Sequence, residues 1–169
     1  MKLKGKLVGA IVGIAVITAA LISAIFIHNM IAESDRQIEI YRQSLTESVE
    51  RELKLETESA ITVLANVYKR QQAGEFTEEQ AKKLAADLVR QMRYDDGAGY
   101  FYIDTYDGVN VVLLGRDSEG KSRINSQDSE GRYYIKEMIA NGRNGGGYTD
   151  LMFAKPNEST PLPKRNYTE

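Results

Sequence analysis

A short aromatic and acidic pattern near the middle of the chain holds the side chains best suited to binding chemistry. Tyr100, Tyr102 and Asp104 alternate with Phe101 and Ile103, and successive side chains of a strand point to opposite faces. One face is then apolar, and the other carries two hydroxyls and a carboxylate. Because tyrosine combines an apolar ring with a polar tip, this face is suited to a small-molecule pocket. An ordinary solvated strand face fits the same spacing.

Basic residues elsewhere in the chain supply the charge that such a face needs to bind an anion. Arg93, Lys136 and Lys164 are the candidates. A cation of this kind pairs with a carboxylate through charge-assisted hydrogen bonds, which are stronger than neutral ones. If this face lines a pocket, one of these cations could pair with a small carboxylate ligand.

Most catalytic and metal sites are disfavoured by the residue types present. The chain has no cysteine and a single histidine, His28, so a zinc site of the usual kind lacks ligands. Ser126 and Ser129 likewise lack a histidine that would activate them. We expect no metal and no cofactor. A membrane-anchored hydrolase using Asp104 or Asp107 is the enzymatic alternative, although a hairpin turn also favours Asp at these positions.

The first elements that would position these side chains are helices. Residues 33–72 contain neither proline nor glycine, and their apolar side chains recur with a mean spacing of about 3.6, the period of a straight helix. Thr77 and Gln80 form a capping box ahead of a second helix at about 78–92. The pattern predicts a long helix followed by a short one.

A sheet region follows at 99–169. The alternating segment 100–105 and the apolar segment 109–114 flank Asp107 and Gly108, which predicts a β-hairpin. A further helix is expected at about 132–141, with Gly142 closing it and with an apolar face made by Tyr134, Ile135, Met138 and Ile139. A third strand is expected at 148–153. The fold class is therefore α+β.

The amino-terminal segment has the composition of a membrane helix. Residues 7–27 contain no charged side chain and follow Lys2, Lys4 and Lys6, and about 20 apolar residues suffice to cross a bilayer. Lysines on the amino-terminal side predict that residues 1–6 stay in the cytoplasm and that residues 28–169 lie outside. A cleaved signal peptide is the alternative, but its apolar core is usually shorter, at about 7–15 residues.

The charge balance argues against nucleic acid as a partner. The chain has 22 basic and 24 acidic residues, and three of the bases precede the apolar segment. The remainder is mildly acidic and lacks the basic stripe that neutralises phosphates.

Several blocks of sequence resemble the single Cache domain of bacterial chemoreceptors, of the type 2 class. They are Gly99 to Gly108, Glu119-Gly120-Lys121, Asp128 to Gly131, Gly145 to Tyr148 and Pro163-Lys164. A lysine-flanked membrane helix that runs into a long periplasmic helix is similar to the same family. The resemblance implies a PAS-like antiparallel sheet that binds a small molecule, often a short organic acid.

The resemblance also implies which residues bind the ligand. Tyr100, Tyr102 and Asp104 would line the cavity from the central strand, Tyr133 and Lys136 from the short helix, and Lys164 from the next strand. Receptors of this kind act as homodimers in the inner membrane of bacteria. No catalysis is implied.

The expected function is the ligand-sensing portion of a methyl-accepting chemotaxis receptor. The alternative is the sensor input of a membrane histidine kinase or a diguanylate cyclase, because similar sensors are attached to both. The family continues with a last strand, a second membrane helix, a HAMP linker and a coiled coil, which do not follow Glu169 in this sequence. We therefore expect a truncated sensor that reaches the chemotaxis kinase and adaptor only through a missing cytoplasmic part.

Overall fold

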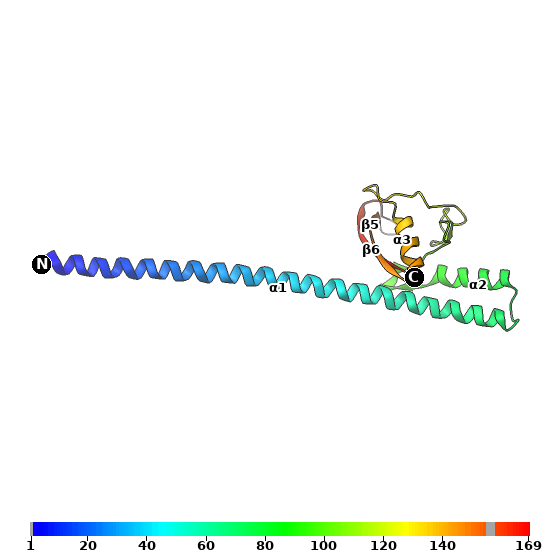
Figure 1. Cartoon of the computed structure of the whole chain (residues 1–169), viewed down its shortest axis with the longest axis horizontal. Coiled ribbons are helices and arrows are strands. Elements are labelled where there is room, and N and C mark those ends of the chain that lie inside the picture. Colours follow the sequence, from blue (N-terminus) through cyan, green and yellow to red (C-terminus); the bar gives the residue numbers. More distant parts are fainter. Residues whose placement is uncertain (1, 155–157) are drawn as a thin grey trace. The chain divides into compact units, whose positions relative to one another are not determined.

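The computed structural model describes residues 2–154 and 158–169, and within them three helices are joined by short strands (Figure 1). The helices are α1 (Lys2–Gln72), α2 (Glu78–Gln91) and α3 (Tyr134–Arg143). The chain divides into one unit that ends at Ser48 and a second unit, Val49–Glu169. The second unit contains every element except the first part of α1.

The first unit is a single stretch of α1 whose apolar side chains are exposed. Ile11, Ile22 and Phe26 are each more than half exposed. Among the described residues, one helix is long and apolar enough to cross a membrane, with a mean hydropathy of 2.7 in its most apolar window. The two helices expected at 7–27 and 33–72 are one continuous helix, because no proline or glycine interrupts the chain between Gly13 and Gly74.

The second helix begins where the capping pattern predicts. The Thr77 side chain accepts a hydrogen bond from the Gln80 backbone N–H, and the Gln80 side chain accepts one from the Thr77 N–H, at 3.2 and 2.9 Å. This reciprocal pair satisfies two donors that a helix start leaves without partners. The predicted capping box is confirmed.

The strands form three antiparallel pairs within the described residues. The first pair is β1 (Arg93–Tyr94) with β2 (Gly99–Tyr100), joined through the 3₁₀ turn η1 (Asp95–Gly97). The second is β3 (Ile103–Asp104) with β4 (Asn110–Val112), and the third is β5 (Gly147–Ala154) with β6 (Pro161–Thr168). The strand expected over 100–105 is therefore interrupted at Phe101 and Tyr102, and the β3–β4 register contains an irregularity next to Asp104.

The hairpin predicted around Asp107 and Gly108 is present, but its second strand is shorter than expected. Gly108 has a φ of +83° and its N–H donates to the Thr105 carbonyl. Strand β4 ends at Val112 because Leu114 has a left-handed backbone, with a φ of +58°. The Leu113 and Gly115 N–H groups both donate to the Glu119 carboxylate, which holds this uncommon conformation.

Helix α3 packs on β5 and forms the centre of the core. Tyr134, Ile135 and Met138 are buried against Leu151 of β5, as the apolar spacing predicts. The helix continues to Arg143, so the expectation that Gly142 closes it is wrong. The left-handed residues that follow are Gly145 and Gly146, with φ of +84° and +117°, and these end the helix.

A buried carboxylate joins the loop before α3 to strand β5. Asp128 is buried, and its oxygens accept hydrogen bonds from the N–H groups of Met152, Glu130 and Arg132. These bonds, above all the one from Met152, hold the pKa of Asp128 below its ordinary value of 3.8. The charged form is therefore part of the folded structure.

Replacing Asp128 by Asn should lower the melting temperature of the protein, because the Asn amide presents N–H to the Met152 N–H. A lowered pKa in the folded state contributes stability above pH 3.8, and this contribution is lost as the pH falls through the folded pKa. The melting-temperature difference between wild type and Asp128→Asn should be constant from pH 7 to pH 5 and narrow below pH 3.8. A difference that grows on acidification would contradict this role.

Candidate functional site

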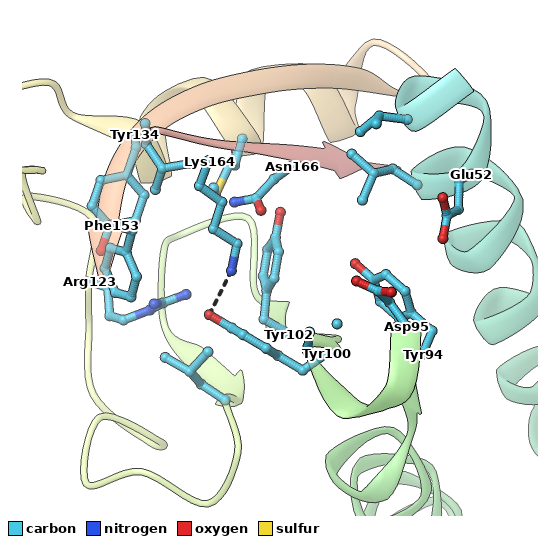
Figure 2. Close-up of a pocket in the computed structure, with 17 residues that line it drawn as sticks. Glu52, Tyr94, Asp95, Tyr100, Tyr102, Arg123, Tyr134, Phe153, Lys164 and Asn166 are labelled. Atoms are coloured by element: carbon cyan, nitrogen blue, oxygen red, sulfur yellow. Dashed lines mark hydrogen bonds between the residues drawn. The ribbon is translucent and has the colours of Figure 1, made fainter. Parts of the chain in front are cut away.

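A cavity of about 260 Å³ opens in the second unit, between the last part of α1, the β1–β2 turn and the β5–β6 pair (Figure 2). Its wall combines apolar side chains with a small number of polar groups, which is the usual composition of a ligand site. The polar and aromatic residues of the wall are Glu52, Tyr94, Asp95, Tyr100, Tyr102, Arg123, Tyr134, Phe153, Lys164 and Asn166.

Lys164 brings a cation into this cavity from strand β6. Its Nζ donates a hydrogen bond of 2.9 Å to the Tyr100 hydroxyl and lies 4.1 Å from the centre of the Tyr100 ring (Figure 2). Within the described residues, no carboxylate lies within ion-pair distance of this ammonium group. The strand pairing sets its position, because Lys164 lies opposite the buried Leu151 of β5.

Arg123 supplies a second cation from the long loop before α3. Its guanidinium forms an ion pair with Asp104, with Nη2 at 2.5 Å from Oδ2, and the two side chains are 11% and 7% exposed. Asn110 donates a further hydrogen bond to Asp104 and is fully buried. The pair is therefore desolvated, and Asp104 fixes the guanidinium at the wall of the cavity.

Tyrosine hydroxyls complete the polar surface. Burial raises the pKa of Tyr102 to about 12, and its hydroxyl lies 2.5 Å from the Thr168 hydroxyl. Burial also raises the pKa of Tyr94 and of Tyr134. These hydroxyls stay protonated at neutral pH and can donate hydrogen bonds to an anion.

The structure brings together three of the six residues that the sequence predicts for ligand binding. Tyr100, Tyr102 and Lys164 line the cavity. Asp104 lies behind Arg123 and lines a second cavity of about 300 Å³ instead. Its role as a direct ligand residue stays a prediction, and the geometry gives it a positioning role.

Tyr133 and Lys136 lie away from this cavity, on the exposed surface. Tyr133 is 46% exposed, and the Lys136 ammonium lies 4.2 Å from the centre of its ring. Helix α3 starts at Tyr134, so the neighbouring tyrosine is the one that faces the cavity. The role of Tyr133 and Lys136 in ligand binding stays a prediction, and their place outside the cavity favours Lys164 over Lys136 as the ligand's cation.

The sequence does not predict the other polar and aromatic residues of the wall, which are Glu52, Tyr94, Asp95, Arg123, Tyr134, Phe153 and Asn166. Asn166 follows Lys164 at a spacing of two on β6, so the alternation of a strand places both on one face. That signal was present in the sequence. Arg123 lies in an irregular loop, where no periodicity indicates the direction of a side chain.

The arrangement can bind a small anion through Lys164, Arg123 and the tyrosine hydroxyls. In the part of the chain that the structure describes, no group of three or more His, Asp or Glu side chains could hold a metal ion.

Comparison with known proteins identifies relatives of this fold. Residues 45–169 match the model of the family described as single Cache domain 2. A solved Cache chemosensory domain, described for its structural basis of carboxylic acid recognition, superposes with a TM-score of 0.69 at 24% identity, covering 74% of this chain and 86% of that one. The chain thus has a Cache sensor fold with a long amino-terminal helix and small antiparallel sheets.

Two curated proteins are similar over most of the chain. The sensor histidine kinase MctS of Rhizobium johnstonii is 27% identical over 131 residues, covering 77% of this chain and 28% of that protein. The methyl-accepting chemotaxis protein CtpM of Pseudomonas aeruginosa is 30% identical over 141 residues, covering 80% and 24%. The chain spans about a quarter of the length of these relatives.

The buried pair Asp104 and Arg123 should behave as a unit in stability measurements. Asp104→Leu and Arg123→Met should each lower the free energy of unfolding by about 3–5 kcal/mol, because each leaves a buried charge without its partner. The double variant should lose about 1–3 kcal/mol less than the sum of the two. Denaturant unfolding of the four proteins measures this coupling.

The exposed pair Glu78 and Lys82 on α2 is the matched control, with side chains 73% and 75% exposed. Its single variants should change stability far less, because solvent screens an exposed pair. Strictly additive losses at Asp104 and Arg123 would show that the two charges do not depend on each other.

Proposed function

This chain belongs to the single Cache domain 2 family, and from that premise we propose that it is the extracytoplasmic ligand-sensing portion of a transmembrane chemotaxis receptor. Its ligand is a small organic acid bound in the 260 Å³ cavity. The observation that carries this proposal is the Lys164 ammonium, which enters the cavity beside Tyr100 with no carboxylate partner in the described structure. A carboxylate ligand would supply the missing counter-charge.

Within this proposal, each charged or hydroxyl group has a task. Lys164 pairs with the carboxylate, while Arg123 adds positive potential that Asp104 partly compensates. Tyr100 and Tyr102 donate or accept hydrogen bonds, and Tyr134, Phe153 and Leu151 surround the rest of the molecule. The relative described for carboxylic acid recognition supports the same ligand class for this fold. The site binds its ligand and does not transform it.

The sensor input of a histidine kinase is the second candidate, favoured by the similarity to MctS over 77% of this chain. A diguanylate cyclase is a further output of the same kind. All of these assign the same sensing role to residues 28–169 and differ in the module that reads the signal. A ligand-binding measurement on this chain therefore tests what they share.

The proposed setting is the bacterial inner membrane. Residues 7–27 would span it, residues 1–6 would lie in the cytoplasm and residues 28–169 in the periplasm. The hydropathy of α1 and the lysines at its start support this topology. We also propose a homodimer that pairs the exposed apolar residues Ile38, Tyr41 and Leu45, which are 50%, 65% and 48% exposed.

Lys164→Met should weaken binding of short monocarboxylates to the full chain. Losing a hydrogen bond to a charged group costs about 1.5–3 kcal/mol, or roughly 10- to 100-fold in the dissociation constant. Isothermal titration with acetate, propionate and butyrate in detergent measures the effect. Lys136→Met is the matched control, because Lys136 also lies over a tyrosine ring but on the exposed surface.

The control variant should bind as the wild type does. A loss of binding in Lys136→Met, together with unchanged binding in Lys164→Met, would move the site to the surface pair. Saturable binding unaffected by either change would remove the cavity assignment.

The absence of cysteine allows a direct test of topology. In spheroplasts, Asn144→Cys should react with a membrane-impermeant maleimide, because Asn144 is exposed in the second unit, whereas Lys4→Cys should react only after lysis. Both variants should retain the mass of the uncleaved chain. Labelling of Lys4→Cys in intact spheroplasts, or loss of the first residues from the mature protein, would contradict the proposed anchor.

A further inference from the structure

The charged residues of the cavity are separated into a basic side and an acidic side. Figure 2 shows Lys164 and Arg123 together with the Tyr100 hydroxyl on one side, and Glu52 and Asp95 beside Tyr94 on the other. All of these residues belong to the cavity wall. Two basic and two acidic side chains in one small cavity would neutralise each other's charge if they formed ion pairs, but the two sets lie on different sides of the cavity.

The two acidic side chains have no ion-pair partner among the residues that the structure describes. Glu52 comes from α1 and Asp95 from η1, and both residues are exposed and line the cavity. Burial is the main cause of the raised pKa of Tyr94, and the negative charges of Glu56, Glu52 and Asp95 raise it further. The charges of Glu52 and Asp95 therefore act on a residue of the cavity wall. Among the described residues, neither carboxylate accepts a side-chain hydrogen bond that would occupy it.

The turn that presents Asp95 is unusual. Asp95 and Asp96 both have a φ of +49°, a left-handed conformation that is uncommon outside glycine and best tolerated by Asp and Asn. Gly99 permits the turn to close, because a Cβ at Gly99 would lie 2.3 Å from the Tyr94 ring. The local backbone therefore brings Asp95 and the Tyr94 ring to the same edge of the cavity.

The basic side and the acidic side of the cavity differ in how many of their charges already have a partner. Asp104 already compensates Arg123 at 2.5 Å, so the Lys164 ammonium is the group that gains most from a carboxylate. At the other side, Glu52 and Asp95 would gain from a cation. A plain monocarboxylate satisfies only Lys164, and a dicarboxylate would place its second charge near two like charges.

We infer that the cavity selects a short bifunctional ligand with a carboxylate at one end and a cationic amino group at the other, so that the carboxylate meets Lys164 and the amino group meets Glu52 and Asp95. This inference rests on the proposed function and narrows its ligand class from carboxylates in general to ω-amino acids. The apolar side chains Leu53, Met138 and Leu151 lie along the wall and suit the methylene chain that separates the two charges.

The test compares ligands that differ only in the amino group. 3-Aminopropionate, 4-aminobutyrate and 5-aminopentanoate are each titrated into the full chain in detergent, beside the isosteric fatty acids butyrate, valerate and hexanoate, which carry a methyl group in place of the ammonium. At least one amino acid should bind 10-fold or more tightly than its isostere. The isostere has the larger apolar surface, so hydrophobic burial alone would give the opposite order.

Variants assign the preference to the acidic side. The double variant Glu52→Gln/Asp95→Asn should reduce the preference for the amino ligand at least 10-fold while leaving the affinity for the fatty acid within about 2-fold. Glu58→Gln/Asp96→Asn is the matched control. Glu58 lies on the same helix outside the cavity wall, and Asp96 shares the φ of Asp95, so this variant should keep the wild-type preference.

The possible outcomes separate this inference from the proposed function. Fatty acids that bind as tightly as the amino acids, with binding weakened by Lys164→Met, would overturn the bifunctional ligand and leave carboxylate sensing in place. A preference that persists in Glu52→Gln/Asp95→Asn would also overturn it. Failure of every carboxylate to bind would overturn both proposals.

Discussion

The buried ion pair between Asp104 and Arg123 is the interaction on which the rest of the site depends. It joins strand β3 to the long loop that precedes α3, and both side chains are nearly inaccessible to water. Asn110 extends the pair, because its amide donates to Asp104 and to the carbonyls of Ile103 and Val112. Such a network stabilises a fold only when every member has its partners. Without Asp104, the guanidinium at the cavity wall would be an uncompensated buried charge.

A second set of polar contacts ties the β5–β6 pair to the part of α1 that lines the cavity. Arg165 bridges Glu50 of α1 and Asp150 of β5, and the Tyr148 hydroxyl donates to the Glu50 carbonyl. Lys164 and Asn166 of β6 and Glu52 and Leu53 of α1 therefore belong to connected walls of one cavity. A ligand that touches both walls can favour one arrangement of strand and helix over another only through a difference in affinity for the two. Because both walls carry groups that can contact a ligand, the affinity for the ligand can differ between two arrangements of the strand and the helix.

Local chemistry explains what the sequence predicts well. The capping box at Thr77 and Gln80, the Asp107-Gly108 turn and the apolar face of α3 all depend on residues a few positions apart. What the sequence does not predict depends on side chains in irregular segments, where no periodicity indicates which group a side chain contacts. Leu114 leaves the strand because the Glu119 carboxylate holds it in a left-handed turn, and Arg123 faces the cavity because Asp104 holds it there. Whether Tyr133 or Tyr134 faces the cavity depends on where α3 begins, because successive residues of a helix point in directions about 100° apart.

Two lysines in this molecule lie over tyrosine rings at almost the same distance but differ in their exposure to solvent. Comparing the two shows how burial affects the attraction between a lysine and an anion. Lys136 lies 4.2 Å from the Tyr133 ring on the exposed surface, and Lys164 lies 4.1 Å from the Tyr100 ring at the cavity. In water the ammonium of Lys136 is solvated on most sides, so a passing carboxylate gains little by replacing that solvent. Lys164 and Tyr100 are half-buried, and the apolar wall leaves the ammonium fewer waters. For two such pairs of side chains, burial and not the contact itself would therefore set how strongly an anion binds.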